Sequence, residues 1–215
     1  MSGTRVVVVG AGGHGREVLD VLDACNRQDP GSFDVLGVVD DAPSELNQKR
    51  LAARGRPHLG SLEEWLVSPP PDAHYLVGIG TAAARRAVDR RMTAAGIPAA
   101  TAVHPSVVTG YDVRLAPGVV VLAGAVLATN IGLGRHTHLH RCATVGHDCT
   151  VGDYVTVNPS ASISGDCVVG DDVMVGVGAA ILQGLRIGDG AVVGGCACVV
   201  RDVAAGSVVK GVPAR

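Results

Sequence analysis

The chain has 215 residues, enough for one large domain or two small ones with a sizeable core. Its net charge of −2 predicts no binding to nucleic acid and no attraction to an anionic membrane. Hydrophobic residues make up 47% of the sequence but aromatic residues only 2%, so the core must consist of small aliphatic side chains.

The first hundred residues alternate between strand and helix patterns. Strands are predicted in "TRVVVVGAG", "FDVLGVVDD" and "HYLVGIG", and helices in "GREVLDVLDAC" and "TAAARRAVDRRMTAAG". A short helix is predicted in "SLEEWLVS", where Ser61 and Glu64 can form a capping box. Strands that alternate with helices imply a small parallel α/β sheet of the Rossmann-like kind, which we assign to residues 1–101.

From about residue 102 the sequence repeats every six residues. Seventeen positions stand six apart from Val103 to Val199, and all but Thr109 hold Val, Ile or Leu. The residue four places later in each phrase is small or aliphatic. This register is the hexapeptide signature of a parallel β-helix, in which the aliphatic residue points inward and glycine allows the turn. Since hexapeptide coils are known to wind left-handed, we predict a left-handed β-helix over residues 102–203 and a tail at 204–215.

The cysteines and the start of the chain bear on localisation. The apolar run "VVVVGAG" lacks the basic flank of a signal peptide, and no run reaches the roughly 18 apolar residues of a membrane span. The six cysteines form no CxxC pair, and Cys149 and Cys167 occupy small, inward-pointing positions of the repeat. We therefore predict a cytoplasmic protein with reduced cysteines.

Two motifs are candidates for function. "GAGGHG", residues 10–15, follows a strand and opens a helix, as a phosphate-binding loop does, although a tight turn alone would also explain it. His147 stands where the repeat requires only a polar residue, and Asp148 follows it. It is either a solvated repeat residue or a general base, because imidazole titrates near neutrality.

A run of three histidines precedes this phrase. His136, His138 and His140 have the H-x-H-x-H spacing of a conceivable zinc site. However, His136 and His138 flank a corner of the repeat and need not converge on one ion. We therefore predict no metal, and interpret His140 as lining the same cleft as His147, one phrase before it.

Five segments carry a family resemblance: "VVVVGAGGHGREVLD", "VVDDAP", "VGIG", "VGHDCTVGD" and "KGVPAR". In these segments, and over its whole length, the chain resembles the bacterial sugar acyltransferases of the sialic-acid O-acetyltransferase and bacillosamine or perosamine N-acetyltransferase type. Proteins of this type are trimers. They use acetyl-CoA to acylate a sugar, often the 4-amino group of a nucleotide-linked amino sugar.

The resemblance implies where the nucleotide sugar binds. The glycine loop would hold its pyrophosphate, with His14 beside it. Asp40 and Asp41, at the end of the second strand, would lie near the base or the ribose. The residues assigned to the nucleotide sugar are Gly10, Gly12, Gly13, His14, Asp40, Asp41 and His140.

The resemblance also implies the catalytic pair. The family's catalytic histidine stands in the same phrase and is followed by an acid, which His147 and Asp148 match, although the family's acid is commonly Glu. Many relatives carry a second histidine nine residues later, near the thioester. Here that position is Thr156, whose hydroxyl can donate a hydrogen bond but is no base near neutrality.

The expected acetyl-CoA site follows from the same resemblance. The oxyanion would be stabilised by a backbone N–H, which the register places at Gly165. Val177 and Gly195 are placed one and two coils later, along the pantetheine arm, and Lys210 of the tail is available to the phosphates of CoA.

Together these features predict a cytoplasmic, trimeric N-acetyltransferase of glycan biosynthesis. It would acetylate the amino group, at C4, of a nucleotide-linked amino sugar, with His147 as base and no acyl-enzyme. Two alternatives stay open: an O-acetyltransferase acting on sialic acid or another sugar, and a non-catalytic trimer that binds nucleotide sugars.

Overall fold

The computed structural model describes residues 3–215. The chain forms two compact units, the first ending at Pro105 and the second beginning at Ser106. None of the helices formed by the described residues has both the length and the apolar character needed to cross a bilayer.

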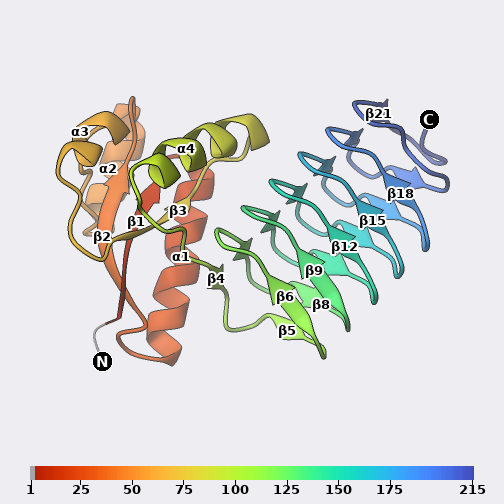
Figure 1. Cartoon of the computed structure of the whole chain (residues 1–215), viewed down its shortest axis with the longest axis horizontal. Helices are drawn as coiled ribbons and strands as arrows, with labels where there is room; N and C mark the ends of the chain where they lie inside the picture. Colours follow the sequence, from red (N-terminus) through yellow and green to blue (C-terminus); the bar gives the residue numbers. More distant parts are fainter. Residues whose placement is uncertain (1–2) are drawn as a thin grey trace. The chain divides into compact units, whose positions relative to one another are not determined.

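The first unit is a three-stranded parallel sheet with helices on both faces (Figure 1). In the sheet β1 lies between β2 and β3, and pairs with both in parallel. The elements of this unit are β1 (Thr4–Val9), α1 (Gly13–Gln28), β2 (Phe33–Val39), α2 (Glu45–Ala53), α3 (Leu62–Val67), β3 (His74–Val77), α4 (Ala82–Ala94) and β4 (Ala102–Val103).

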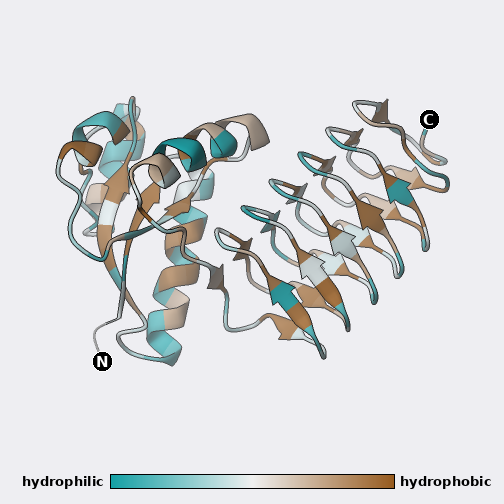
Figure 2. Ribbon diagram, in the orientation of Figure 1, coloured by the Kyte–Doolittle hydropathy of each residue, from teal (hydrophilic) through white to brown (hydrophobic). Residues whose placement is uncertain are grey.

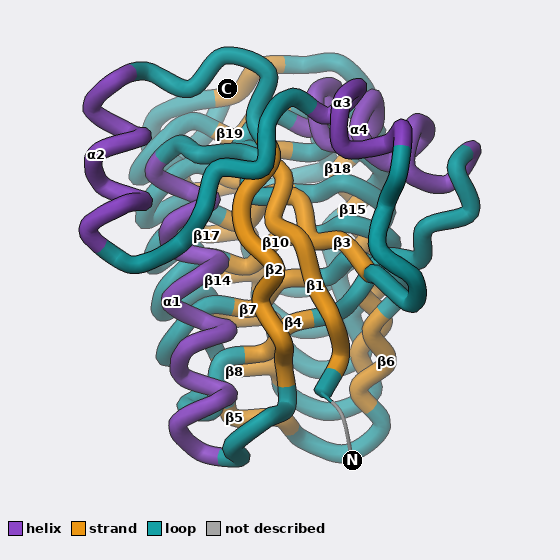
Figure 3. Tube along the Cα trace, turned by 90° about the vertical axis from the view of Figure 1, so that its left-hand side faces the viewer, coloured by secondary structure: helices purple, strands orange, loops and turns teal. Residues whose placement is uncertain are grey.

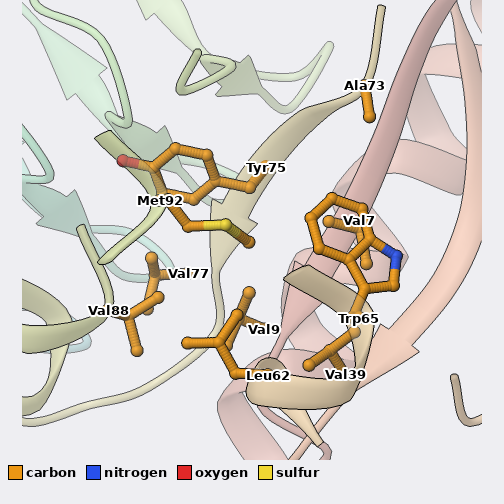
Figure 4. Packing of buried hydrophobic residues seen from close by; sticks show 10 residues of the cluster. All are labelled: Val7, Val9, Val39, Leu62, Trp65, Ala73, Tyr75, Val77, Val88 and Met92. Carbon is orange, nitrogen blue, oxygen red and sulfur yellow. The ribbon is translucent and has the colours of Figure 1, made fainter. Parts of the chain in front are cut away.

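The side chains of β1 point alternately into two separate hydrophobic cores, one on each face of the sheet. Val7 and Val9 point into a cluster with Trp65 of α3 and Met92 of α4, which Figure 4 shows. The residues between them, together with the apolar side of α1, are buried on the opposite face. Figure 3 accordingly shows α1 on one side of the sheet and α3 and α4 on the other. In Figure 2 the strands β1 and β2 are largely brown, as expected for a sheet that is covered on both faces.

The predicted strands and helices of this unit are confirmed, with one omission. The capping box of α3 forms as predicted, since Ser61 Oγ accepts from the Glu64 N–H and Glu64 accepts from the Ser61 N–H. The helix α2 was not among the predicted elements. Its signal was Ser44, whose side chain caps the helix by accepting from the Asn47 N–H. Only Leu51 of this helix is buried, so the apolar periodicity was too weak to indicate it.

The second unit is a parallel β-helix of very short strands, whose successive coils follow one another from left (green) to right (blue) in Figure 1. Its strands form three flat sheets, in the orders β21-β19-β16-β13-β10-β7, β20-β17-β14-β11-β8-β5 and β18-β15-β12-β9-β6. Each strand pairs with the equivalent strand one coil away, as β11 does with β8 and β14. The strands are β5 (Val108–Thr109), β6 (Val113–Leu115), β7 (Val120–Val121), β8 (Val126–Leu127), β9 (Ile131–Leu133), β10 (His138–Leu139), β11 (Thr144–Val145), β12 (Thr150–Val151), β13 (Thr156–Val157), β14 (Ser162–Ile163), β15 (Val168–Val169), β16 (Met174–Val175), β17 (Ala180–Ile181), β18 (Arg186–Ile187), β19 (Val192–Val193), β20 (Cys198–Val199) and β21 (Val208–Val209).

The six-residue register predicted from the sequence is confirmed. Every position of the aliphatic ladder from Val121 to Val199 is buried, with at most 3% of its surface exposed. Cys149 and Cys167 are buried as predicted, with 1% and 0% exposed. Residues 204–215, expected as a tail, continue the coil: β21 pairs with β19, and the Ala214 N–H donates to the Cys198 carbonyl at 2.8 Å.

The expectation that glycine allows the turn holds for only some of the turns. The left-handed backbone conformation falls three residues after the ladder position; glycine holds it at Gly118, Gly124, Gly178, Gly184 and Gly190, and other residues hold it elsewhere, such as Asn130 (φ 58°) and Asp148 (φ 59°). Asn and Asp tolerate this conformation better than most residues. Gly146 serves a different need, because a side chain there would meet the Gly165 nitrogen of the next coil at 2.5 Å. Gly146, directly after the ladder residue Val145, therefore permits the close stacking of coils.

Candidate active site

The glycine loop before α1 contains two kinds of glycine. A side chain on Gly10 would meet a backbone carbonyl at 2.8 Å, and one on Gly15 would overlap the Gly10 carbonyl oxygen. At these two positions the neighbouring backbone leaves no room for a side chain, so only glycine fits. By contrast, a side chain on Gly12 would meet nothing within 4 Å, and one on Gly13 only Arg16 Nη2 at 4.0 Å. The space beside the two central glycines is open.

The N-terminus of α1 presents unused hydrogen-bond donors to this space. Gly12 is the N-cap, and no side chain caps the helix. Within residues 3–215 the N–H groups of Gly13 and Gly15 find no acceptor. Arg16 braces the loop by donating from Nη1 to the Ala11 carbonyl at 2.9 Å. Free N–H groups at the positive end of a helix are suited to binding a phosphate.

A cavity of about 270 Å³ opens at the carboxyl ends of the three strands of this sheet. This edge is where ligands bind in parallel α/β sheets. The cavity has mostly apolar walls and two carboxylates at its rim. Its lining residues are Val9, Gly10, Asp40, Asp41, Ala42, Leu62, Ile79 and Val88.

The two carboxylates of the cavity differ in what they already bind. Asp40 accepts the Ala11 N–H with Oδ2 at 2.7 Å and the Ala42 N–H with Oδ1 at 3.0 Å, so it ties the glycine loop to the end of β2. Asp41 accepts the Leu62 N–H with Oδ1 at 2.8 Å, and its Oδ2 lies 4.0 Å from Arg91 Nη1. Of the two, Asp41 has the oxygen that accepts no backbone N–H.

His14, predicted beside the pyrophosphate, lies in the first turn of α1. Its Nδ1 is 3.4 Å from Glu17 Oε2, one turn further along the helix. The structure thus brings Gly10, Asp40 and Asp41 together in one cavity, and places His14 on the helix that opens beside it.

In the second unit, His147 stands at one end of a hydrogen-bonded row of side chains, with Asp148 in the middle and Asn130 at the other end. Its Nδ1 lies 2.8 Å from Asp148 Oδ2, and Asp148 Oδ1 accepts from Asn130 Nδ2 at 2.8 Å. Since a carboxylate only accepts, Nδ1 carries the proton and Nε2 of the neutral ring has a free lone pair. The hydrogen bond from Asn130, and next that from His147, hold the pKa of the Asp148 carboxyl below its ordinary value. Asn130 was not among the predicted site residues.

The imidazole of His147 lies against Gly165, one coil later. A side chain built on Gly165 would overlap Nε2 of His147 and would come within 2.5 Å of Cε1. Gly165 is buried, and for its N–H no acceptor is found in the part of the chain that the structure describes. Buried backbone N–H groups without acceptors are rare. This donor therefore lies unused beside the free nitrogen of His147.

Equivalent N–H groups at another corner of the coil are satisfied by side chains. There Asp153 Oδ1 accepts from the Arg135 N–H at 2.7 Å, and Asp171 and Asp189 accept from the coils before them at 2.8 and 3.0 Å. In this aspartate ladder, each backbone N–H at the corner donates to the aspartate of the next coil. Among the residues that the structure describes, no side chain accepts the Gly165 N–H in this way.

Two of the predicted acetyl-CoA contacts lie at a different corner from the one expected. Val177 and Gly195 were placed one and two coils after Gly165, in line with it. That prediction is wrong, because Val177 follows β16 and Gly195 follows β19, whereas Gly165 follows β14 in another sheet. Their separations from Gly165 are not whole coils. Val177 and Gly195 do stack on each other, with a gap of 3.3 Å between Val177 Cγ1 and a side chain built on Gly195.

The remaining predicted residues are distributed over other parts of the β-helix. Thr156 is buried in β13, in a different sheet from His147, and pairs with His138 and Met174 of the neighbouring coils. His140 lies in the turn after β10. Val177 lies at the same corner of the β-helix two coils later, after β16. Lys210 is exposed after β21, where its N–H and carbonyl pair with Arg215.

The three histidines before this phrase are spread over a turn and a strand. His136 is buried and stacks on Tyr154, with ring centroids 5.7 Å apart. His138 is buried within β10, and His140 follows that strand. Among the described residues these three form no common set of metal ligands.

The thiol nearest to His147 in sequence is unsuited to attack a thioester. Cys149 is buried, and Sγ donates to the Ser164 carbonyl at 3.1 Å. Burial raises the pKa of the Cys149 thiol to about 11, so it stays protonated at neutral pH. We expect Cys149→Ala to keep kcat within about twofold of wild type, as measured by steady-state kinetics. A loss of about 10²-fold or more, typical of a group that acts in the chemical step, would make this thiol a nucleophile.

The contact between Gly165 and His147 gives a second prediction. In Gly165→Ala the new methyl group displaces the imidazole, because the ring can rotate whereas the stacked backbone cannot. We expect kcat to fall about 10- to 100-fold, as for other small misplacements of a catalytic group, with little change in melting temperature. A variant that keeps the wild-type kcat would show that the ring need not lie against this residue.

An α/β unit followed by a hexapeptide β-helix, with a histidine–carboxylate pair at one corner, defines a hexapeptide-repeat transferase. The chain matches the model of the PglD N-terminal domain over residues 5–92. It is 33% identical over 154 residues to a GDP-perosamine N-acetyltransferase of Escherichia coli O157:H7. This alignment spans 71% of the present chain and 66% of that relative, or about two thirds of its length.

Solved structures extend the similarity to the whole chain. A mutant perosamine N-acetyltransferase from Caulobacter crescentus, in complex with CoA and GDP-perosamine, matches with a TM-score of 0.89 at 30% identity, over 100% of this chain and 96% of that one. The acetyltransferase domain of PglB from Neisseria gonorrhoeae FA1090, in complex with acetyl coenzyme A, matches with a TM-score of 0.86 at 27% identity, over 100% and 99% of the two chains. The chain belongs to the bacterial family of acetyl-CoA-dependent sugar N-acetyltransferases of the bacillosamine and perosamine type. The resemblance predicted from its motifs is confirmed.

Proposed function

We propose that the protein transfers the acetyl group of acetyl-CoA to the amino group of a nucleotide-linked amino sugar, with the C4 amine as acceptor. The observation that carries the proposal is the placement of His147. Its Nδ1 is fixed by Asp148, while its Nε2 lies beside the unused N–H of Gly165. A base and an oxyanion donor side by side are what acyl transfer to an amine requires.

The transfer follows from this arrangement. The acceptor amine attacks the thioester carbonyl carbon, and Nε2 of His147 takes a proton from the nitrogen as the C–N bond forms. The Gly165 N–H donates to the oxyanion of the tetrahedral intermediate. The C–S bond then breaks, and the proton on His147 passes to the CoA sulfur. No covalent acyl-enzyme is required, in keeping with the buried, protonated Cys149.

The first unit is proposed to hold the nucleotide. The free N–H groups of Gly13 and Gly15 would bind the pyrophosphate, and the cavity beside them would take the ribose and base. Asp40 then serves mainly to shape the loop, and Asp41 keeps an oxygen for the nucleotide. Relatives that bind CoA and GDP-perosamine make a GDP-linked amino sugar the first acceptor to test.

The proposal is tested by acetylation of an acceptor panel, followed by mass spectrometry of the products. The panel contains GDP-, UDP- and dTDP-linked 4-amino sugars, the matching free amino sugars, and sialic acid. The expected product is the amide of a nucleotide-linked sugar. An ester product, or equal activity on free sugars, would instead indicate a sugar O-acetyltransferase. Binding without turnover of any acceptor would indicate a non-catalytic protein.

We also propose a cytoplasmic homotrimer, in which the face of one β-helix completes the site of the next. Apolar outward-facing residues support an interface, including Val126, Val168, Met174, Leu182 and Val200, each at least 39% exposed in the single chain. Such an assembly would let Val177 and Gly195 of one copy reach the His147 corner of another, whereas the buried Thr156 would stay within its own β-helix. Light scattering is expected to give the mass of a trimer, and a stable monomer at micromolar concentration would contradict it.

A further inference from the structure

Asn130 lies one coil before Asp148 and is hydrogen-bonded to it. The two residues are 18 positions apart, and Asn130 Nδ2 donates to Asp148 Oδ1 at 2.8 Å. The other oxygen of the same carboxylate, Oδ2, lies 2.8 Å from His147 Nδ1. The carboxylate is therefore held from both sides, by an amide on one coil and by an imidazole on the next.

The backbone fixes both ends of this bridge. Asn130 and Asp148 occupy the same left-handed turn position, with φ of 58° and 59°. The Asn130 N–H donates to the Tyr111 carbonyl at 2.8 Å, and the Asp148 N–H donates to the Thr129 carbonyl at 2.9 Å. Because the two turns have the same shape and are stacked one coil apart, their side chains leave the backbone in the same direction. The amide of Asn130 thus meets the carboxylate without strain on either turn.

We propose that Asn130 is a positioning residue of the catalytic pair, whose amide holds the Asp148 carboxylate in the rotamer that faces His147 Nδ1. The inference rests on the proposed role of His147 as the base. Its physical reason is exposure: the side chains of His147 and Asp148 are each 50% accessible. A carboxylate at the surface otherwise exchanges between rotamers and between protein and water partners. Held by Asn130, it keeps the proton of the neutral ring on Nδ1 and leaves Nε2 free.

The charges along this stack of turns support the assignment. Asp112 lies one coil before Asn130, and Asp166 lies one coil after Asp148, so acids occupy the same turn position in the adjoining coils. Asn130 is the uncharged member of this row and the donor to its neighbour. An acid at position 130 would instead face Asp148 with a like charge, and would raise the proton affinity of the pair.

The test is a double-mutant cycle in kcat. Asn130→Gly removes the amide and keeps a residue that favours left-handed φ. If Asn130 acts through Asp148, kcat of the variant falls about tenfold, as expected when a catalytic group is slightly misplaced. KM for both substrates stays unchanged. Combined with Asp148→Asn, Asn130→Gly costs no more than Asp148→Asn alone. The matched control Asp112→Gly, one coil earlier at the same turn position (φ 51°), keeps the wild-type kcat.

A second readout is independent of turnover and of the acceptor. Nitrogen-15 NMR of the histidine side chains, with the His147 signals identified from their loss in His147→Asn, reports which ring nitrogen carries the proton. When the ring is neutral, the proton is expected on Nδ1 in the wild type, and Asn130→Gly is expected to move a fraction of it to Nε2. Asn130→Asp, which keeps the shape of the side chain, is expected to shift the acid limb of the kcat/KM profile to higher pH, because added negative charge stabilises the imidazolium.

The outcomes separate the inference from the function on which it rests. Additive losses in the cycle together with an unchanged tautomer of His147 would overturn the role of Asn130. A wild-type enzyme that acetylates no amino sugar would overturn the proposed function, and the NMR comparison would still decide whether Asn130 orients the pair. Should Asn130→Gly fail to fold, the shift in the pH profile of Asn130→Asp decides the question.

Discussion

His147→Asn is expected to lower kcat by about 10²- to 10⁴-fold, the usual contribution of a general base. Asn has roughly the size of His and can still donate to Asp148, but it cannot take a proton from the acceptor amine. The side chain of His147 is half exposed, and it contacts Asp148 and the Gly165 backbone. The melting temperature, the assembly and the affinity for CoA should therefore stay near the wild-type values. Steady-state kinetics, thermal unfolding and calorimetry measure these quantities.

A residue with only a structural role would behave in the opposite way. It would show a modest loss of rate and a measurable loss of stability. Retention of more than about half of the wild-type kcat in His147→Asn would show that this residue is not the base, on the scale expected for general base catalysis. His140, at the adjoining corner of the coil, would then be the next residue to test.

Gly13→Val is expected to raise the KM for the nucleotide sugar at least about tenfold, with little change in the KM for acetyl-CoA. The new side chain enters open space, meeting only Arg16 Nη2 at 4.0 Å, so the fold is kept. It would occupy the place of the phosphate oxygens above the α1 N–H groups. Losing one hydrogen bond to a charged group costs roughly 1.5–3 kcal/mol, which accounts for a tenfold change or more.

A neighbouring glycine supplies the control for this variant. A side chain on Gly15 would overlap the Gly10 carbonyl oxygen, so Gly15→Ala is expected to lower the melting temperature. Gly13→Val should leave the melting temperature unchanged. Equal increases in both KM values for Gly13→Val would contradict a nucleotide site at the N-terminus of α1.

The fold was predictable from the sequence because each structural unit leaves a periodic signal. The ladder from Val121 to Val199 repeats one shape every six residues, so its register could be read without the structure. The helix α2 could not be read in this way, since Leu51 is its one buried residue. Its cap at Ser44 was the available signal.

The site residues were predictable only where they belong to one short sequence motif. His147 and Asp148 are adjacent in one phrase, and the structure shows them hydrogen-bonded. Asn130 escaped notice because its contact depends on the left-handed turn that stacks it on Asp148, although the interval of 18 residues could have indicated it. The same interval, applied to Val177 and Gly195, would have placed them at another corner from Gly165.

The roles of His147 and of the α1 N-terminus can be tested together in a crystal structure of the protein with CoA and its unreacted nucleotide-linked amino sugar. We expect the acceptor nitrogen within hydrogen-bond reach of His147 Nε2, about 2.6–3.2 Å, with the CoA sulfur beside it. We also expect the pyrophosphate on the N–H groups of Gly13 and Gly15. An acceptor amine bound away from His147, or a nucleotide held elsewhere than at the start of α1, would contradict the proposed mechanism.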